Sequence, residues 1–248
     1  MPAGYPVSMA LRTRYAAVLS AFAAVALLAG CTTTPGAETP TSSAAPSSAP
    51  EDADDRNDVE GVLLDNGRMF AVITSGSSTC VPQVDQVSAD GQTVTVTLVD
   101  VPGDAACTKD LVPRASLGAL PEGVDPKSDI TLQVTYGDVN DDVDIDGDPA
   151  ATGESGLETG MSTAAWFDDG GLVLLTWGSS SCVPVVESLE GAGNAGTATF
   201  VTDDQQICTM DMGPRGTILD FGEDAVDDDG PFTLTLVGDG LDGTIRIG

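Results

Sequence analysis

The feature that most constrains this chain is an internal repeat of about 100 residues. Two short motifs, which contain four of its five cysteines, each occur twice at shifts of 102 and 101 residues. The matching segments are 75–82 (SGSSTCVP) with 177–184 (WGSSSCVP), and 107–114 (CTKDLVPR) with 208–215 (CTMDMGPR). The similarity extends outward over residues 59–148, here called repeat 1, and residues 160–248, here called repeat 2. Both repeats should therefore have the same fold.

Within each repeat the pattern indicates short β-strands separated by turns. The run 93–99 (TVTVTLV) alternates between polar and apolar residues, which is typical of a half-buried strand. Asp65-Asn66-Gly67 and Ala89-Asp90-Gly91 have the residues that hairpin turns favour. No segment shows helical periodicity over three turns. About seven strands per repeat predict an all-β fold, with two small β-sandwich or Greek-key barrel units in tandem. One pseudo-symmetric domain built from both repeats is the alternative.

The repeat also predicts how the cysteines pair. Cys31 precedes both repeats, and the other four cysteines allow three pairings. Only the pairs Cys80–Cys107 and Cys182–Cys208 keep each bond inside its own repeat. Each bond closes a loop of fewer than 30 residues, which stabilises the fold by about 3–4 kcal/mol if the effect is entropic.

The N-terminus has the order of an export signal. Arg12 and Arg14 precede an apolar run of 14 residues, 15–28, which is short for a membrane-spanning helix but typical of a signal-peptide core. The run ends in Leu28-Ala29-Gly30-Cys31. Translation from Met9 instead of Met1 would preserve all of these features.

This ending resembles the lipobox of bacterial lipoproteins. The resemblance implies that residues 1–30 are a signal peptide, cleaved before Cys31, and that Cys31 carries diacylglycerol and often a further acyl chain such as palmitate. Two or more acyl chains form a firm anchor. Residues 31–58 follow, rich in Thr, Ser, Pro, Ala and acids and without a large apolar residue. We expect this segment to be a disordered stalk.

Charge excludes several classes of function. The chain has 9 Lys plus Arg, 39 Asp plus Glu and no His, with a net charge of −30. This balance argues against nucleic-acid binding and against adhesion to anionic lipid, both of which need clustered cations. Without His there is no Ser-His-Asp triad and no imidazole metal ligand. We therefore expect the protein not to be an enzyme.

The repeated motif Cys-Thr-x-Asp-x-x-Pro-Arg places Arg114 and Arg215 at matching positions, four residues after the acids Asp110 and Asp211. A local Asp–Arg pair that holds the loop is the expected explanation. The alternative is that Arg114 and Arg215 bind a carboxylate ligand. The preceding Gly-Ser-Ser segment is interpreted as a tight turn that directs the Cys, with an anion-binding nest as the alternative.

A candidate calcium loop comprises Asp142, Asp144 and Asp146, followed by Gly147. Oxygen ligands at positions one, three and five with Gly at six match the start of such a loop. Position twelve is Gly153 where the loop needs Glu, and the second copy of this segment reads as a plain final strand. An edge strand with its acids facing water is therefore the competing interpretation.

The segments GSSSCVP and CTxDxxPR also resemble motifs of actinobacterial envelope lipoproteins, which implies localisation and fold class but no activity. Together these features predict a lipoprotein on the extracytoplasmic face of the cell membrane. We expect a non-catalytic binding or structural module whose partner is an envelope protein or a wall component, without a cofactor other than Ca²⁺. The alternatives are a calcium-dependent adhesive or structural module, an inhibitor of secreted proteases and a carboxylate-based hydrolase.

Overall fold

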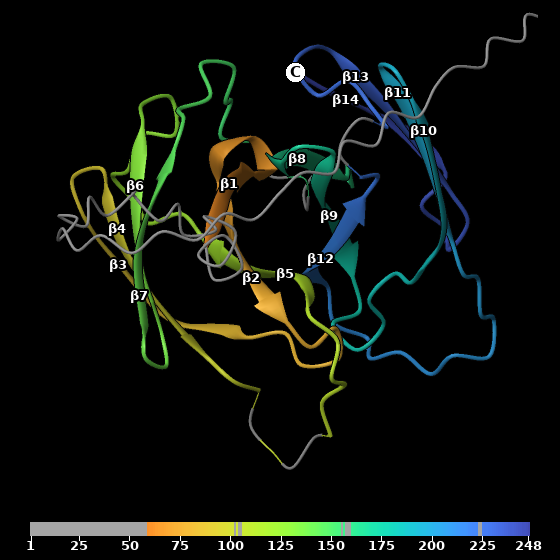
Figure 1. Cartoon of the computed structure of the whole chain (residues 1–248), viewed down its shortest axis with the longest axis horizontal. Coiled ribbons are helices and arrows are strands. Elements are labelled where there is room, and N and C mark those ends of the chain that lie inside the picture. The colour runs from red at the N-terminus through yellow and green to blue at the C-terminus, as the bar shows by residue number, and fades with distance from the viewer. Residues whose placement is uncertain (1–58, 102, 104–105, 155, 157–159, 223–224) are drawn as a thin grey trace, which may run out of the picture. The chain divides into compact units, whose positions relative to one another are not determined.

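The computed structural model describes residues 59–101, 103, 106–154, 156, 160–222 and 225–248 (Figure 1). The export signal, Cys31 and the stalk lie outside the described residues. Both repeats belong to one compact unit. In the part of the chain that is described, no helix is both long and apolar enough to cross a membrane.

Each repeat contains seven strands, as the sequence predicts. In repeat 1 they are β1 (Glu60–Leu64), β2 (Met69–Gly76), β3 (Gln83–Asp90), β4 (Thr93–Val99), β5 (Val112–Ala119), β6 (Ile130–Tyr136) and β7 (Val139–Ile145). In repeat 2 they are β8 (Thr163–Asp168), β9 (Gly171–Gly178), β10 (Val186–Ala192), β11 (Ala195–Phe200), β12 (Gly213–Asp220), β13 (Phe232–Val237) and β14 (Gly243–Ile247). The all-β fold class is confirmed.

The two repeats have the same topology. Repeat 1 forms a three-stranded sheet, β1-β2-β5, and a four-stranded sheet, β3-β4-β6-β7. Repeat 2 forms the sheets β8-β9-β12 and β10-β11-β13-β14 in the same order. Neighbouring strands are antiparallel except β4 with β6 and β11 with β13, which are parallel. The parallel pairs arise because the intervening strand, β5 or β12, belongs to the other sheet, so the chain crosses over and returns.

Each repeat is a sandwich with its own core. Val94, Val96 and Leu98 of β4 point inward and are at most 2% exposed, while the threonines between them face outward. They pack against Phe70 and Val72 of β2 in the facing sheet. Burying a side chain of this size contributes roughly 1.5–3 kcal/mol. Repeat 2 has an equivalent core, in which Trp166 packs edge-to-face on Phe232 at 5.0 Å.

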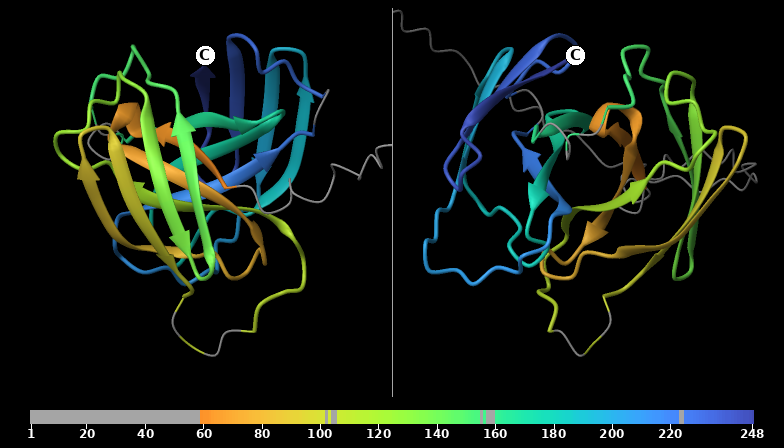
Figure 2. Two further views of the ribbon diagram at one scale, coloured as in Figure 1. Left: turned by 60° about the vertical axis from the view of Figure 1, so that its left-hand side comes forward. Right: turned by 180° about the vertical axis from the view of Figure 1, so that it is seen from behind.

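A third core joins the two repeats through their three-stranded sheets. Ala71 and Ile73 of β2 lie in one apolar cluster with Val173 and Leu175 of β9. The three-stranded sheets lie between the two four-stranded sheets, as two views show (Figures 1 and 2). Strands β2 and β9 are therefore covered on both faces, which explains why their sequences are nearly continuous apolar runs. Each repeat thus has its own core, and the repeats share another.

The turn Asp65-Asn66-Gly67 joins β1 to β2, as predicted. It is a short 3-10 turn in which all three residues have positive φ, between 52° and 84°. Asn and Gly adopt this conformation at low cost. Asp65 is 1% exposed, and its backbone N–H donates to Thr163 Oγ1 of β8 at 3.2 Å. The hairpin of repeat 1 is thereby tied to the first strand of repeat 2.

Candidate functional site

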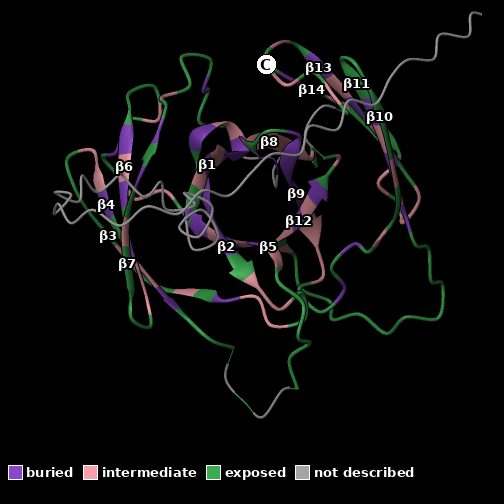
Figure 3. Ribbon diagram, in the orientation of Figure 1, coloured by how far each residue is buried: buried purple, intermediate pink, exposed green. Residues whose placement is uncertain are grey.

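Two disulfides lie at equivalent places in the repeats, where the chain passes between its two sheets. Cys80 pairs with Cys107 and Cys182 with Cys208, with Cα–Cα distances of 5.5 and 5.6 Å. The predicted pairing is confirmed. The segments 106–111 and 201–212, which contain Cys107 and Cys208, are exposed, whereas Cys182 is buried. In Figure 3 the strands of the three-stranded sheets are mostly buried and the long loops between the sheets are mostly exposed.

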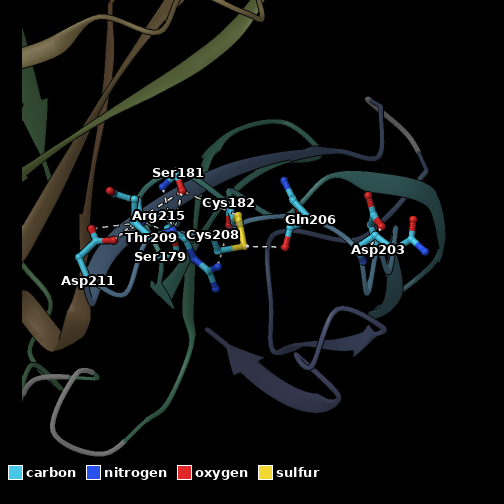
Figure 4. The surroundings of a disulfide bond; sticks show 11 residues. Ser179, Ser181, Cys182, Asp203, Gln206, Cys208, Thr209, Asp211 and Arg215 are labelled. Carbon is cyan, nitrogen blue, oxygen red and sulfur yellow. Dashed lines mark hydrogen bonds between the residues drawn. A yellow bond between two sulfur atoms is a disulfide. The ribbon is translucent and has the colours of Figure 1, made fainter.

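The Gly-Ser-Ser turn before each disulfide is held by an aspartate of the opposite segment. In repeat 2 the backbone N–H of Ser180 donates to both carboxylate oxygens of Asp211, at 3.2 and 3.3 Å. The hydroxyls of Ser179 and Thr209 lie 2.7 Å apart, and the N–H of Thr209 donates to Ser181 Oγ at 3.0 Å (Figure 4). The turn thus uses an N–H group to bind the chain's own carboxylate.

Repeat 1 has the same network. The N–H of Ser78 donates to both oxygens of Asp110 at 3.3 Å, and Ser77 Oγ lies 2.8 Å from Thr108 Oγ1. The hydrogen bonds from Ser78 and Thr108 lower the pKa of Asp110 to about 2, and equivalent bonds lower the pKa of Asp211 to about 2. These carboxylates are therefore ionised at neutral pH.

The predicted local Asp–Arg pair is wrong. Arg114 is 7% exposed, and its guanidinium donates to the carbonyl of Cys80 at 2.6 Å and to Thr74 Oγ1 at 3.3 Å. Arg114 lies in β5 opposite Thr74, so its side chain lies along β2. Asp110 precedes the strand and binds the turn instead.

Arg215 of repeat 2 is bound in the same way. Its Nη1 donates to the carbonyl of Cys182 at 2.8 Å, and its Nε to Thr176 Oγ1 at 3.2 Å. Partial burial lowers the pKa of Arg215, and the nearby charge of Asp239 opposes this shift. Each arginine therefore connects the carbonyl of a disulfide cysteine to the neighbouring strand. The ligand-binding role of Arg114 and Arg215 stays a prediction.

The glycine of the turn provides the space for each arginine. A Cβ on Gly76 would lie 2.4 Å from Arg114 Cζ, and one on Gly178 would lie 2.6 Å from Arg215 Cζ. Sequence reasoning treated this glycine only as a turn residue. The glycine recurs four residues before the cysteine in both repeats, as does the later arginine, and this joint recurrence could have indicated their contact.

The acids of the candidate calcium loop lie on and beside an extended edge strand. Asp142 and Asp144 project from the exposed face of β7, and Asp146 follows its end. Asp144 accepts a hydrogen bond from Thr131 Oγ1 of β6 at 2.8 Å. The segment therefore has the conformation of the competing interpretation, an edge strand. Among the described residues, no three acidic or cysteine side chains are grouped to hold a metal ion. Calcium binding stays a prediction.

The loops around the disulfides differ between the repeats in their exposed apolar side chains. Ile207 and Met210, on either side of Cys208, are 94% and 103% exposed. The matching residues of repeat 1 are Ala106 and Lys109. Further exposed apolar residues of this part of repeat 2 are Val183, Val185, Val201 and Met212. Of these, only Val185 has a polar counterpart, Gln83, because repeat 1 also has apolar residues at the other three positions, among them exposed Leu111 and Val99. We call the six residues in repeat 2 the apolar loop surface of repeat 2.

Two depressions lie in different repeats of the molecule. One, of about 600 Å³, is on the outer polar face of the four-stranded sheet of repeat 1 and is lined by Thr95, Gln133, Val134, Thr135, Asn140, Asp141 and Asp142. The other, of about 410 Å³, lies in repeat 2 and includes Met212 of the apolar loop surface. Neither Arg114 nor Arg215 lines them.

Comparisons with known proteins add no assignment: no family model matches the chain, and no curated protein or solved structure matches it.

Proposed function

We propose that this protein is a lipoprotein, anchored through Cys31 to the extracytoplasmic face of the cell membrane, that binds another component of the cell envelope without catalysing a reaction. The N-terminal sequence supports the anchor, and the long polar segment before residue 59 supports a stalk that separates the β-sandwiches from the bilayer. The disulfides, one in each repeat, fit an oxidising exported compartment.

The observation that carries the binding role is the apolar loop surface of repeat 2. Ile207 and Met210 are almost fully exposed, although exposing large apolar side chains to water is unfavourable. The disulfide beside them restrains the loop, which lowers the entropy lost when a partner binds. Within this surface the two repeats differ at Val185, Ile207 and Met210, where repeat 1 has Gln83, Ala106 and Lys109.

The aspartates of the two disulfide turns do not suit the role of a catalytic acid. A carboxylate-based hydrolase needs one acid with a raised pKa, which serves as the proton donor. Among the described carboxylates, the resolved shifts at Asp110 and Asp211 are downward, and both acids are engaged with backbone N–H groups. They serve the turns of the two repeats.

Photo-crosslinking in intact cells tests the binding role. A benzophenone amino acid replaces Met210 in the full-length protein, and the matched control carries it at Lys109 in repeat 1. We expect a discrete cross-linked product from position 210 and none from position 109. No product from either position, or the same products from both, would contradict the proposal.

Fractionation of the same cells tests the anchor. We expect Cys31→Ser to release the protein from the membrane fraction, because the lipid cannot be attached. If the variant stays with the membrane after a salt wash, the lipid anchor is wrong.

A further inference from the structure

The depression in repeat 2 is a groove between two sheet edges. It lies where the chain enters β8, the edge strand of the three-stranded sheet, and beside β14, the edge strand of the four-stranded sheet. Buried Leu236 forms part of its floor, and Met161, Trp177, Met212 and Leu241 are among its walls. Its volume of about 410 Å³ suits one or two large apolar side chains.

Repeat 1 has two residues at the equivalent place that contact each other. Val59 is 7% exposed and packs in the core, and its N–H donates to Asp141 Oδ2 of β7 at 3.4 Å. The strand registers place Ser162 at the position of Val59 and Gly243 at the position of Asp141. Repeat 2 therefore lacks both the buried valine and the carboxylate that accepts its N–H.

The groove is open at Gly243. A Cβ on Gly243 would meet only the carbonyl oxygen of Leu241, at an ordinary 3.6 Å. Met161 and Met212 on its walls are 54% and 63% exposed. Methionine side chains are flexible and polarisable, and they adapt to apolar ligands of different shape. Edge strands also offer unpaired backbone groups to an extended peptide.

Charge restricts what the groove can bind. Asp242 lines it, Asp211 precedes Met212, and Asp239 is close enough to influence Arg215. Anionic lipid and a second copy of this acidic chain are repelled, and the stalk has no large apolar residue to insert. We propose that the groove binds an extended segment of another protein, with an apolar side chain flanked by lysine or arginine. This inference rests on the proposed binding role of repeat 2.

A direct binding measurement tests the groove. The probe is a synthetic peptide with leucine, valine and phenylalanine at its centre and a pair of lysines at each end, titrated calorimetrically into the full chain. The variant Ser162→Val/Gly243→Asp installs the two residues that repeat 1 has at these positions. We expect it to bind the peptide about tenfold more weakly or worse. Non-specific attraction predicts equal or tighter binding, because the variant adds an acid.

Two further variants keep the test decisive. Met161→Glu removes an exposed wall residue without touching the core, and we expect it to weaken binding as well. Asn140→Asp adds the same charge on the outer face of repeat 1, and we expect it to leave the affinity unchanged. Equal affinity of wild type and both groove variants would overturn the inference.

Two other probes examine the alternative occupants. We expect no binding of the peptide whose lysines are replaced by glutamates, and none of phosphatidylglycerol vesicles. Binding of either as tightly as the lysine peptide would overturn the inference. Failure at the groove together with a cross-link from position 210 would leave the proposed function standing, because Ile207 and Met210 lie outside the groove lining.

Discussion

At the scale of single residues, each disulfide turn depends on an arginine and a glycine. The guanidinium group occupies the space that a Cβ atom of the glycine would need. The guanidinium of Arg215 lies against Gly178 and donates to the carbonyl of Cys182. Cys182 is buried, and a buried carbonyl without a hydrogen-bond donor lowers the stability of the folded state. Glycine, arginine and cysteine thus form one structural unit, present once in each repeat.

The change Gly178→Ala tests this unit. We expect it to lower the free energy of unfolding by about 1–3 kcal/mol, because the new methyl group displaces Arg215 from its acceptors. The control is Gly213→Ala, directly opposite on β12, where a Cβ meets nothing closer than 3.8 Å. We expect a change there of less than about 0.5 kcal/mol. Equal effects in chemical denaturation would contradict the assignment.

Protonation of the turn aspartates gives a second prediction. Because the folded-state pKa of Asp211 is lowered from 3.8 to about 2, its contribution to stability is present above pH 3.8 and is lost as the pH falls through 2. We expect Asp211→Asn to reduce the dependence of stability on pH within this window. The carboxyl carbon chemical shift of Asp211, followed by NMR, measures the midpoint directly. A midpoint near 3.8 would show that the turn does not bind the carboxylate.

Several of these residue roles could not be predicted from the sequence. The repeat was enough to pair the cysteines, because it left one arrangement inside each unit. The prediction for Arg114 was wrong, because the short distance along the chain suggested Asp110 as its partner. The actual partners, Thr74 and Cys80, come from the adjacent strand and the turn, and depend on a strand register that the sequence does not reveal.

At the scale of elements, the strands and the hairpin turns followed from the sequence, whereas the core that the two repeats share did not. Alternation in β4 directly indicates one buried face. The runs in β2 and β9 are apolar at nearly every position, which is compatible with a strand but does not show what covers its second face. The acids of β7 are ambiguous in another way, since their spacing fits both a calcium loop and an edge strand.

The disulfides are the element-scale devices that restrain the exposed loops. The bonds close loops with sequence separations of 27 and 26 residues. We therefore expect replacing either pair by serines to destabilise its own repeat by about 3–4 kcal/mol, with nearly equal effects. Thermal unfolding of the two double variants checks this. If only one of the two double variants is less stable, the loop-entropy explanation of the disulfides' contribution is wrong.

At the scale of the whole molecule, the two repeats are joined through a core of their own. Two neighbouring residues of β9 belong to different cores. Leu174 points into the core of repeat 2, and Leu175 points into the shared core, although both are fully buried. We therefore expect the two repeats to unfold cooperatively and not as independent domains.

Matched truncations test this coupling. We expect Leu174→Ala and Leu175→Ala each to cost about 2–5 kcal/mol. In hydrogen exchange, Leu175→Ala should increase the exchange of β2 in repeat 1 more than Leu174→Ala does, because it opens the shared core directly. Faster exchange limited to repeat 2 in both variants would show that the repeats are energetically separate.

A loop exchange distinguishes the proposed binding face of repeat 2 from the matching surface of repeat 1. The variant Val185→Gln/Ile207→Ala/Met210→Lys gives repeat 2 the residues that repeat 1 has at the matching positions. The measurement is the affinity for the partner captured from position 210, with the reciprocal Lys109→Met variant as control. We predict a loss of about tenfold or more for the exchange and no change for the control. Unchanged affinity of the exchanged protein would contradict the account.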